Sequence, residues 1–353
     1  MGNISTTDAR ALFTKMLVDV YKERTTPTGF LRSFFKVKEG VTKELSIEVQ
    51  RGTEKIAVDV QRGTEGNRNS FSLSTEKIFV PPYYREYFDN TSLDLYDRLF
   101  GSTEIEAGIF TAFVEEVADK YRALQDKIER SYELQCAQVF LTGIVQLSNG
   151  INIDFKRKAA SLLDLGTINA NRYWTDNTNS TPHADLEAGC KFIRQKGKSV
   201  GGVFNAIFGA TALSAFLGNA KVTARADIRN FSLDNVAAPQ RNSVGGTLHG
   251  EVSVGAYVVR IWSYAEFYDD ADGVSTPYID DNKVVIIPEN PRFTLGFAAV
   301  PQLLKEGAMP QKGAFIFNNY IDERAESHVY DIKSAGVAIP VAVDQIYTVR
   351  VVA

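Results

Sequence analysis

The sequence predicts an α+β fold, and two kinds of pattern support this prediction. Strict alternation of apolar and polar residues, which is typical of half-buried strands, begins near Val41, and beyond Gly250 the chain reads mainly as strands and turns. Helical spacing of apolar residues extends over an unusually long segment, from Thr103 to about Val145. With 353 residues, of which 44% are hydrophobic, the chain is long enough for one large or two ordinary domains.

The N-terminal part is predicted to be an arm followed by a β-hairpin. Residues 1 to about 36 show no sustained periodicity apart from a short helix over Thr7 to Lys22. Two strands follow, joined by a turn at residues 51–54, and their apolar residues form one stripe: Leu45, Ile47, Val49, Ile56, Val58 and Val60. No neighbouring helix in the sequence can cover this stripe, so either the chain's own core or another subunit must do so. The sequence alone leaves both open.

The long helical segment is the strongest single pattern. Thr103 and Glu106 form a capping box at its start. At about 1.5 Å per residue the helix would be roughly 60 Å long, several times the usual length. Its apolar face advances mostly in steps of four without sustained heptads, which favours packing on a sheet over a coiled coil. This face consists of Ile105, Ile109, Phe113, Val117, Tyr121, Leu124, Ile128, Tyr132 and Val139.

Turn and cap signals divide the rest of the chain. Asn149-Gly150 joins two alternating segments and predicts a tight hairpin whose second strand turns Ile151, Ile153 and Phe155 to the core. Thr181-Pro182 predicts the start of a helix that continues through Leu186, Cys190 and Ile193 and stops at Gly197. The remaining expected elements are a strand near 204–208, a helix ending at Gly218, and strands within 252–262, 283–287, 292–297 and 339–351.

Composition excludes several classes of protein. The formal charge of -4 indicates neither a dedicated nucleic-acid binder nor a protein of anionic membranes. The most apolar stretch, residues 203–217, falls short of the ~20 residues that span a bilayer, and the N-terminus carries no secretory signal. Cys136 and Cys190 lie at apolar helical positions, where we expect buried thiols rather than a disulfide or a zinc site.

Motifs that would carry chemistry are incomplete. Residues 197–199 resemble the end of a phosphate-binding loop, but Phe192 stands where that pattern needs a glycine. The acidic residues of 269–273 suggest a calcium loop, but Ile279 stands where the bidentate glutamate should be, so we expect a polar hairpin turn. The histidines stand far apart. We therefore assign no catalytic, cofactor-binding or metal-binding residue and expect no enzymatic activity.

Several blocks, taken in order, resemble a known family. From about Thr28 onward the chain is similar to the lambda-type major capsid proteins of tailed phages, the capsid protein E family. The blocks that carry this resemblance are FFKV, QRGTE, KIFVPPYYREYFD, KIERSYELQCAQVF, NGINIDFKRKAAS, HGEVSVGAYVVRIWSYAEFY, TPYIDDNKVVIIP and KSAGVAIPVAVDQIYT.

The resemblance implies a capsid fold of the Hong Kong 97 type. It divides the chain into an N-terminal arm (1–36), an extended hairpin called the E-loop (37–80), a peripheral domain with the long spine helix (81–163), an axial domain (164–283) and strands shared by both domains (284–353). In this fold the E-loop lies over an adjacent subunit, which would cover the apolar stripe of the predicted hairpin.

The implied function is self-assembly into hexamers and pentamers that tile an icosahedral shell around packaged double-stranded DNA. Our candidates for ion pairs between subunits are charged residues of the E-loop, although ordinary solvated charges are an equal alternative: Lys43, Glu54, Lys55, Arg62, Glu65 and Arg68. The implied partners are other copies of the chain, a separately encoded scaffolding protein, a portal and in some cases a decoration protein. DNA contacts would be non-specific, no membrane or cofactor is implied, and assembly would take place in the host bacterial cytoplasm.

Other interpretations predict different observations. An encapsulin-like compartment shell shares the fold and would enclose protein cargo instead of DNA. An intracellular enzyme would be a small discrete oligomer with a pocket where polar groups converge, and a nucleoid-type DNA binder would need a basic face.

Overall fold

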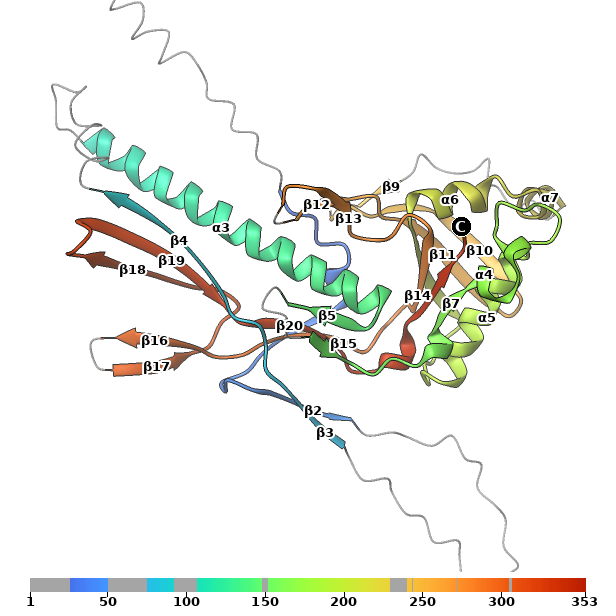
Figure 1. The fold of residues 1–353 in the computed structure, drawn as a ribbon, viewed down its shortest axis with the longest axis horizontal. Helices are drawn as coiled ribbons and strands as arrows, with labels where there is room; N and C mark the ends of the chain where they lie inside the picture. The colour runs from blue at the N-terminus through green and yellow to red at the C-terminus, as the bar shows by residue number, and fades with distance from the viewer. Residues whose placement is uncertain are drawn as a thin grey trace, which may run out of the picture.

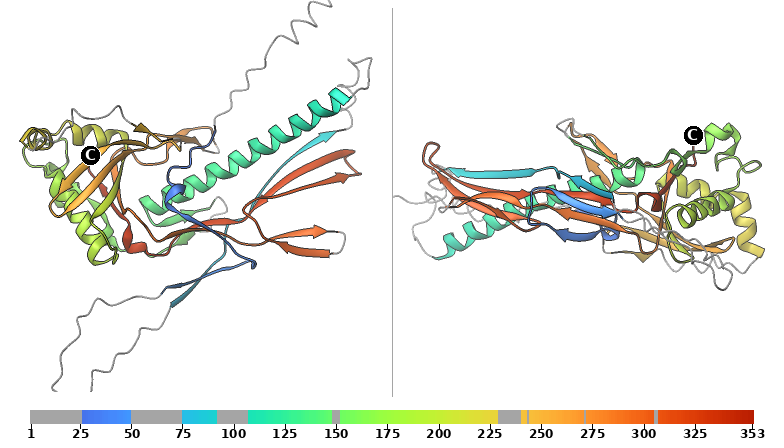
Figure 2. Two further views of the ribbon diagram at one scale, coloured as in Figure 1. Left: turned by 180° about the vertical axis from the view of Figure 1, so that it is seen from behind. Right: turned by 90° about the horizontal axis from the view of Figure 1, so that it is seen from below.

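The computed structural model describes residues 26–49, 75–91, 107–147, 152–228, 240–242, 244–270, 272–304 and 307–353. The molecule is elongated and flattened (Figures 1 and 2). One half is built on the long helix α3 (Ala107–Leu141), and the other half is a twisted sheet with short helices. Both helices and sheets are present, which confirms the α+β prediction.

Helix α3 confirms the predicted long helix. Its 35 residues correspond to about 52 Å. Ile128, Tyr132 and Val139 of the predicted apolar face are fully buried. The helix ends at Leu141, earlier than expected, because Gly143 adopts a φ of 75° and its amide bonds back to the Gln138 carbonyl. Val145 therefore belongs to a strand, while the predicted capping box of Thr103 and Glu106 lies outside the described residues.

A three-stranded sheet packs along the N-terminal part of α3. Its order is β18 (Ile316–Asp322), β19 (Ser327–Ser334) and β4 (Tyr84–Thr91), all antiparallel. Phe88 packs edge-on against Tyr121 of α3 with ring centroids 5.4 Å apart and stacks on Tyr330 at 5.1 Å. The Tyr121 hydroxyl donates to the Asn318 carbonyl at 2.8 Å, which ties the outer strand to the helix.

Two further sheets continue this half of the molecule. β1 (Lys36–Glu39), β15 (Phe293–Phe297) and β20 (Gly336–Pro340) form a sheet that packs on the C-terminal half of α3. Tyr132 contacts Phe297 and Phe140 contacts Phe293, with centroids 5.4 and 5.7 Å apart. β16 (Val300–Leu304) and β17 (Gly307–Gln311) form a separate hairpin that extends beside β18 and β19 (Figure 1).

The other half is a seven-stranded sheet whose two faces belong to different cores. In β14 and β8 alternate side chains divide between them: Val285, Ile287 and Ile207 join the core around α3, while Ile286 and Phe208 join the core around α5. The strand order is β7 (Leu162–Asp164), β21 (Tyr347–Arg350), β14 (Lys283–Pro288), β8 (Val203–Phe208), β11 (Tyr257–Ser263), β10 (Thr247–Val254) and β9 (Gln240–Arg241).

The helices of this half agree with the predictions where these exist. Helix α5 (Pro182–Gln195) begins with proline at its first turn, as expected, and buries Leu186, Cys190 and Ile193. Gly189 lets α5 approach the sheet closely, because an added Cβ would lie 2.6 Å from Ile286. The predicted helix that ends at Gly218 is α6 (Ala210–Leu217), and the other helices are α4 (Leu165–Ile168) and α7 (Ala220–Ile228).

Two short hairpins were expected from their turns. β5 (Ile144–Gln146) pairs with β6 (Asn152–Asp154) on either side of the Asn149-Gly150 position, which itself lies outside the described residues. Phe155 is buried and Ile153 partly buried, as predicted. β12 (Phe267–Asp269) and β13 (Ser275–Pro277) pair with Asp269 opposite Ser275, so Asp270, Asp272 and Gly273 lie in the turn of a polar hairpin, as expected.

Two strand predictions were wrong in detail. The alternating tail 339–351 is not one strand, because β20 ends at Pro340 and a short helical turn, Val343–Gln345, precedes β21. The stretch 252–262 contains the turn between β10 and β11, with Gly255 at a φ of 59°.

The first strand of the predicted N-terminal hairpin pairs with a different strand from the one expected. β2 (Leu45–Val49) is present, but it pairs with β3 (Thr75–Phe79), with Leu45 opposite Phe79. The expected partner around 55–61 lies outside the described residues. A turn at 51–54 would have paired Val49 with a residue close in sequence, whereas Val49 lies opposite Thr75, so the connection is far longer than the sequence suggested.

Arg157 joins the two halves of the molecule at the C-terminus of α3. Its guanidinium donates to the Phe140 carbonyl at 2.6 Å, to the Ser161 carbonyl at 3.0 Å and to the Thr348 hydroxyl at 2.9 Å. A cation at this position also interacts favourably with the dipole of α3. The last turn of the helix is thus fixed to β21 of the seven-stranded sheet.

We expect Arg157→Met to lower the free energy of unfolding by about 2–3 kcal/mol, because it removes several enclosed hydrogen bonds to one charged group. Urea denaturation would measure this loss. The neighbouring Lys158→Met is the control, since Lys158 forms a 2.6 Å ion pair with Asp344 but is 49% exposed, and such pairs contribute at most about 1 kcal/mol. Equal denaturation midpoints for the two variants would contradict this role of Arg157.

Candidate assembly surfaces

The first described residues, 26–35, form an N-terminal root that is built into the core. Phe30, Leu31 and Phe35 are buried. The Phe30 ring lies 5.3 Å from Trp262 and 5.4 Å from Tyr264 of the seven-stranded half. The root therefore holds the start of the described chain at the joint between α3 and that half.

Glu133 of α3 is the polar centre of this joint. Its carboxylate is fully buried and accepts hydrogen bonds from the backbone amides of Leu31 and Arg32, at 2.7 and 3.1 Å, and from the Tyr264 hydroxyl at 2.9 Å. The Arg32 guanidinium lies 3.7 Å from Glu133 and 3.1 Å from Glu129. Thr28 bonds to the Tyr264 hydroxyl at 2.6 Å. Root, helix and sheet thus converge on one carboxylate.

Burial raises the pKa of Glu133 to about 7, although the surrounding donors and the Arg32 cation act in the opposite direction. The native protein therefore binds this proton more tightly than the unfolded chain does. Sequence reasoning missed this group, because a glutamate within a long helix is usually solvated.

The ribbon, which consists of β2 and β3, leaves the body of the molecule (Figure 1). Its base is fixed on one side: Leu45 packs over Gly296, where an added Cβ would lie 2.7 Å from its side chain, and the Ala299 amide bonds to the Thr42 carbonyl at 3.0 Å. Beside this base, Val41, Ile78 and Val80 are 69%, 61% and 53% exposed.

The uncovered apolar residues of the ribbon differ from those expected. Leu45 of the predicted stripe is partly buried on the chain's own core, whereas Ile78, which lies opposite Ser46 on the other face of the ribbon, is exposed. Leu45, the member of the predicted stripe whose side chain the structure describes, is covered by the chain's own core, which is one of the two alternatives that the sequence left open. The exposed Ile78 belongs to β3, a strand that was not predicted. For Ile47 and Val49 the structure describes the strand but not the side chains.

A second surface, the tyrosine face, consists of Tyr83, Arg85, Tyr87 and Tyr320. Strand alternation turns Arg85 and Tyr87 away from α3, since Tyr84 and Phe88 of the same strand pack on that helix. The three tyrosines are 50%, 63% and 42% exposed. Sequence reasoning missed this surface, because aromatic residues occupy both faces of β4.

A buried ion cluster supports the tyrosine face. Asp331 is fully buried and pairs with Arg85 at 3.0 Å and with Lys333 at 3.4 Å. Asp331 thus fixes the Arg85 guanidinium at the centre of this face, where the Arg85 side chain is 45% exposed. Exposed tyrosines around an arginine have the composition of energetically important protein interfaces.

The charged candidates from the sequence are mostly untested by the structure. Lys43 is exposed at the base of the ribbon and forms no ion pair with the other described residues. The other candidates lie outside the described residues: Glu54, Lys55, Arg62, Glu65 and Arg68. Whether any of these six residues contacts another subunit stays a prediction.

The part of the chain that the structure describes contains no cluster of three or more histidine, cysteine or acidic residues that could hold a metal ion. None of its helices is long and apolar enough to cross a membrane. Cys136 and Cys190 are buried, and burial raises the pKa of both thiols, as expected for cysteines that pack as small apolar residues.

Comparison with known protein families identifies the family of this chain. The family model described as phage major capsid protein E matches residues 14–353. The chain belongs to the phage major capsid protein E family. This match covers nearly the whole sequence and favours a phage capsid protein over an encapsulin-like compartment shell.

Solved structures show that this member of the capsid protein E family has the Hong Kong 97 type fold. A prophage protein of Escherichia coli CFT073, described as a capsid protein, aligns over 99% of both chains with a TM-score of 0.61 and 15% identity. A phage-related protein of Bordetella bronchiseptica RB50 aligns over 93% of both chains with a TM-score of 0.52 and 12% identity. A chain of the mature bacteriophage PhiM1 capsid aligns with a TM-score of 0.51 and 14% identity, covering 94% of this chain and 89% of that one.

No curated protein gives a significant sequence match. The family is one of structural capsid proteins. The resemblance inferred from the sequence blocks is thereby confirmed at the level of family and fold.

We expect the free energy of unfolding to fall between pH 5 and pH 8 through Glu133. Its native pKa of about 7 exceeds the ordinary 4.5, so the stabilisation is complete below pH 4.5 and is lost as the pH rises through 7, by about 3 kcal/mol in order of magnitude. Urea titrations at several pH values would measure this slope.

Glu133→Gln should flatten this pH dependence. Glu129→Gln, one turn away and partly exposed, should leave it intact. A slope in the Glu133→Gln variant equal to that of the wild type would show that another group is responsible.

Proposed function

We propose that the chain is the building block of an icosahedral phage shell, in which it assembles into hexamers and pentamers around packaged double-stranded DNA. The family membership supports this proposal. The observation that carries it is the ribbon, which leaves its own molecule with Val41, Ile78 and Val80 exposed. Exposed apolar side chains on and beside a projecting strand pair are typical of a protein interface.

The proposed contact is heterologous, with the ribbon of one copy on the tyrosine face of the next. The two surfaces differ in kind: one is aliphatic, and the other consists of tyrosines around the partly exposed Arg85. Because each copy carries both surfaces, the contact repeats from copy to copy and closes into a ring when the rotation allows it. Charged residues of the E-loop, among them Lys43, would set the register.

The function consists of association alone, with no reacting substrate, metal or cofactor. A formal charge of -4 suits a shell around DNA, since a lining that bound phosphates tightly would oppose movement of the genome. A separately encoded scaffold, a portal, a decoration protein in some cases and assembly in the bacterial cytoplasm belong to the same proposal, which the resemblance to the lambda-type proteins supports.

Negative-stain electron microscopy of the expressed chain tests the proposal directly. Rings or closed shells are expected, alone or together with the products of neighbouring genes. A chain that stays a compact monomer at high concentration would contradict it.

Ile78→Asp should raise the subunit concentration needed for assembly at least about tenfold, because an interface that buries this side chain gains about 1.5–3 kcal/mol from it. Light scattering across a dilution series would measure the threshold, and circular dichroism would check the fold. Ile168→Asp is the control, since Ile168 is 53% exposed on α4 of the other half. An equal effect of both substitutions on the assembly threshold would show that the ribbon is not part of the contact between subunits.

The double variant Tyr87→Ala/Tyr320→Ala should raise the same threshold while lowering the unfolding free energy by no more than about 1 kcal/mol, because the two side chains are 63% and 42% exposed in the single chain. Phe267→Ala removes a 55% exposed aromatic ring elsewhere and serves as the control. Assembly of the double variant at the wild-type concentration would exclude the tyrosine face as the receiving surface.

A further inference from the structure

Four cations gather at the C-terminal end of α5, in a surface that we call the basic loop. It consists of Lys196 and Lys198, which follow the helix, and of Lys158 and Arg292, and all four are exposed. The sequence contains no acidic residue from 188 to 225. A cation at a helix C-terminus interacts favourably with the helix dipole, but this effect fades within the last turn. The dipole therefore does not account for the cations beyond Lys196.

Hydrogen bonds bring the segments of the basic loop together. The Gln345 side-chain amide donates to the Gly197 carbonyl at 3.2 Å, and the Gln345 side-chain oxygen accepts the Arg292 amide at 3.0 Å. Lys158 pairs with Asp344 at 2.6 Å, so this carboxylate compensates one of the four cations.

Acidic residues gather at the end of the β12–β13 hairpin, in a surface that we call the acidic tip. It consists of Asp269, Asp270 and Asp272, which are all exposed. The Asp270 carboxylate accepts the Asp272 and Val274 amides, both at 2.9 Å, which fixes the shape of the turn. The sequence contains no lysine or arginine from 261 to 282, so the hairpin brings no cation of its own to balance these carboxylates.

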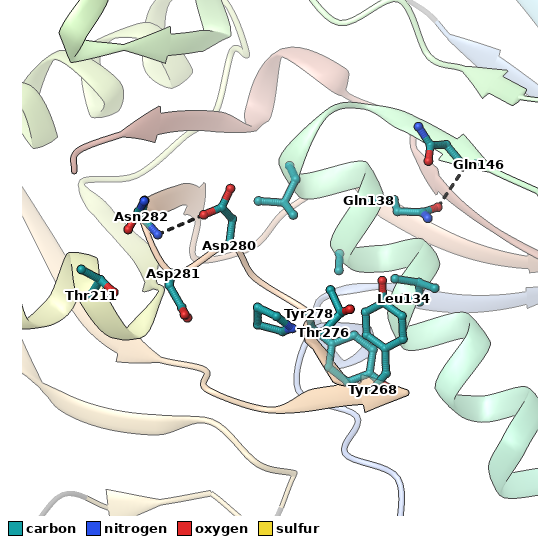
Figure 3. Close-up of a pocket in the computed structure, with 13 residues that line it drawn as sticks. Leu134, Gln138, Gln146, Thr211, Tyr268, Thr276, Tyr278, Asp280, Asp281 and Asn282 are labelled. Carbon is teal, nitrogen blue, oxygen red and sulfur yellow. Dashed lines mark hydrogen bonds between the residues drawn. The ribbon is translucent and has the colours of Figure 1, made fainter. Parts of the chain in front are cut away.

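The other side of this hairpin is turned to the body of the molecule. Tyr268 and Thr276, which lie opposite each other in the two strands, line a pocket together with Leu134 of α3 (Figure 3). Because side chains alternate along a strand, Asp269 points away from this pocket. The hairpin is therefore held at its base while its charged tip faces solvent.

The basic loop and the acidic tip lie on opposite sides of the molecule. In Figure 1 the ribbon leaves the body at the lower side, where the turn Val343–Gln345 holds the basic loop, and the β12–β13 hairpin lies at the upper side. The rear view in Figure 2 agrees. A ribbon that reaches a neighbour turns this lower side towards that copy, which in a head-to-tail ring presents its upper side.

Each of the two charged surfaces also exposes a valine. Val200, two residues after Lys198, is 90% exposed, and Val274, at the end of the turn of the acidic tip, is 58% exposed. A protein partner would cover these side chains, and burial of apolar side chains is favourable. A polyanion such as nucleic acid would bind only the basic loop, whereas a second copy of the chain provides a partner for both surfaces.

We propose that the acidic tip of one copy binds the basic loop of the next, in addition to the ribbon contact. This inference rests on the proposed shell function and adds a second contact to it. Each copy carries one surface of each sign, and like charges repel, so copies join head to tail. The contact involves the end of the hairpin, beyond the Phe267–Pro277 pair at its base.

Charge reversal tests this contact. Lys196→Glu/Lys198→Glu and Asp269→Lys/Asp272→Lys should each raise the subunit concentration needed for assembly at least about tenfold at low ionic strength, because attraction becomes repulsion. Added salt should reduce this difference, since it screens exposed charges. Light scattering measures the threshold, and circular dichroism checks the fold. Asp270 is left unchanged because it holds the turn.

The decisive variant combines all four substitutions. It should assemble near the wild-type threshold, because each contact again joins opposite charges. The control combines Lys196→Glu/Lys198→Glu with Glu323→Lys/Glu326→Lys in the exposed turn between β18 and β19. This control has the same net charge as the fourfold variant but should stay impaired.

Wild-type thresholds in the double variants, or equal recovery of the fourfold variant and its control, would overturn the inference. So would impairment by the lysine reversal alone, because the acidic tip would then not be the partner of the basic loop. In each of these cases a wild-type chain that still forms rings or shells leaves the proposed function intact. A wild-type chain that stays monomeric would contradict both.

Discussion

One buried stripe of α3 holds the molecule together, because otherwise separate sheets pack on it. Tyr121 binds the outer strand β18, Phe140 packs on Phe293 of β15, and the Phe140 carbonyl accepts from Thr348 of β21 at 2.7 Å. The two three-stranded sheets have too few strands to form a core without the helix, whereas the seven-stranded sheet that contains β21 has a second core around α5. The length of α3 is therefore a structural requirement: a shorter helix would leave one of the sheets without support.

At the joint between the two halves, aromatic packing surrounds one buried carboxylate, that of Glu133. Around Glu133, aromatic packing of Phe30 with Trp262 and Tyr264 fixes the root, while the carboxylate collects donors from three elements. An apolar residue at this position would leave the Leu31 and Arg32 amides without acceptors, and an unmet buried amide costs more than an ordinary hydrogen bond gains. The carboxylate thus specifies where the N-terminal segment crosses the helix.

The sequence predicted those elements whose signals are local. The period of α3, the proline start of α5 and the strand pairs β5–β6 and β12–β13 were predicted from neighbouring residues, and the structure contains all of them. The partner of β2 was not found, because the nearest alternating segment competes with β3 and only tertiary contacts, such as Leu45 on Gly296, separate the two. The tyrosine face and Glu133 were missed for the same reason, since their roles depend on residues distant in sequence.

The two faces of the ribbon explain how a projecting strand pair can be both anchored and available. Leu45 turns to one face and is held by Gly296 and the apolar cluster around Val300, so the base of the ribbon has a fixed orientation in the single chain. Ile78 turns to the other face and is left exposed. If both faces of the ribbon were packed on the body, no surface would remain for a neighbouring subunit. If neither face were packed, binding a neighbour would carry the full entropic cost of ordering the ribbon. Anchoring one face lowers that cost while leaving the other free to bind.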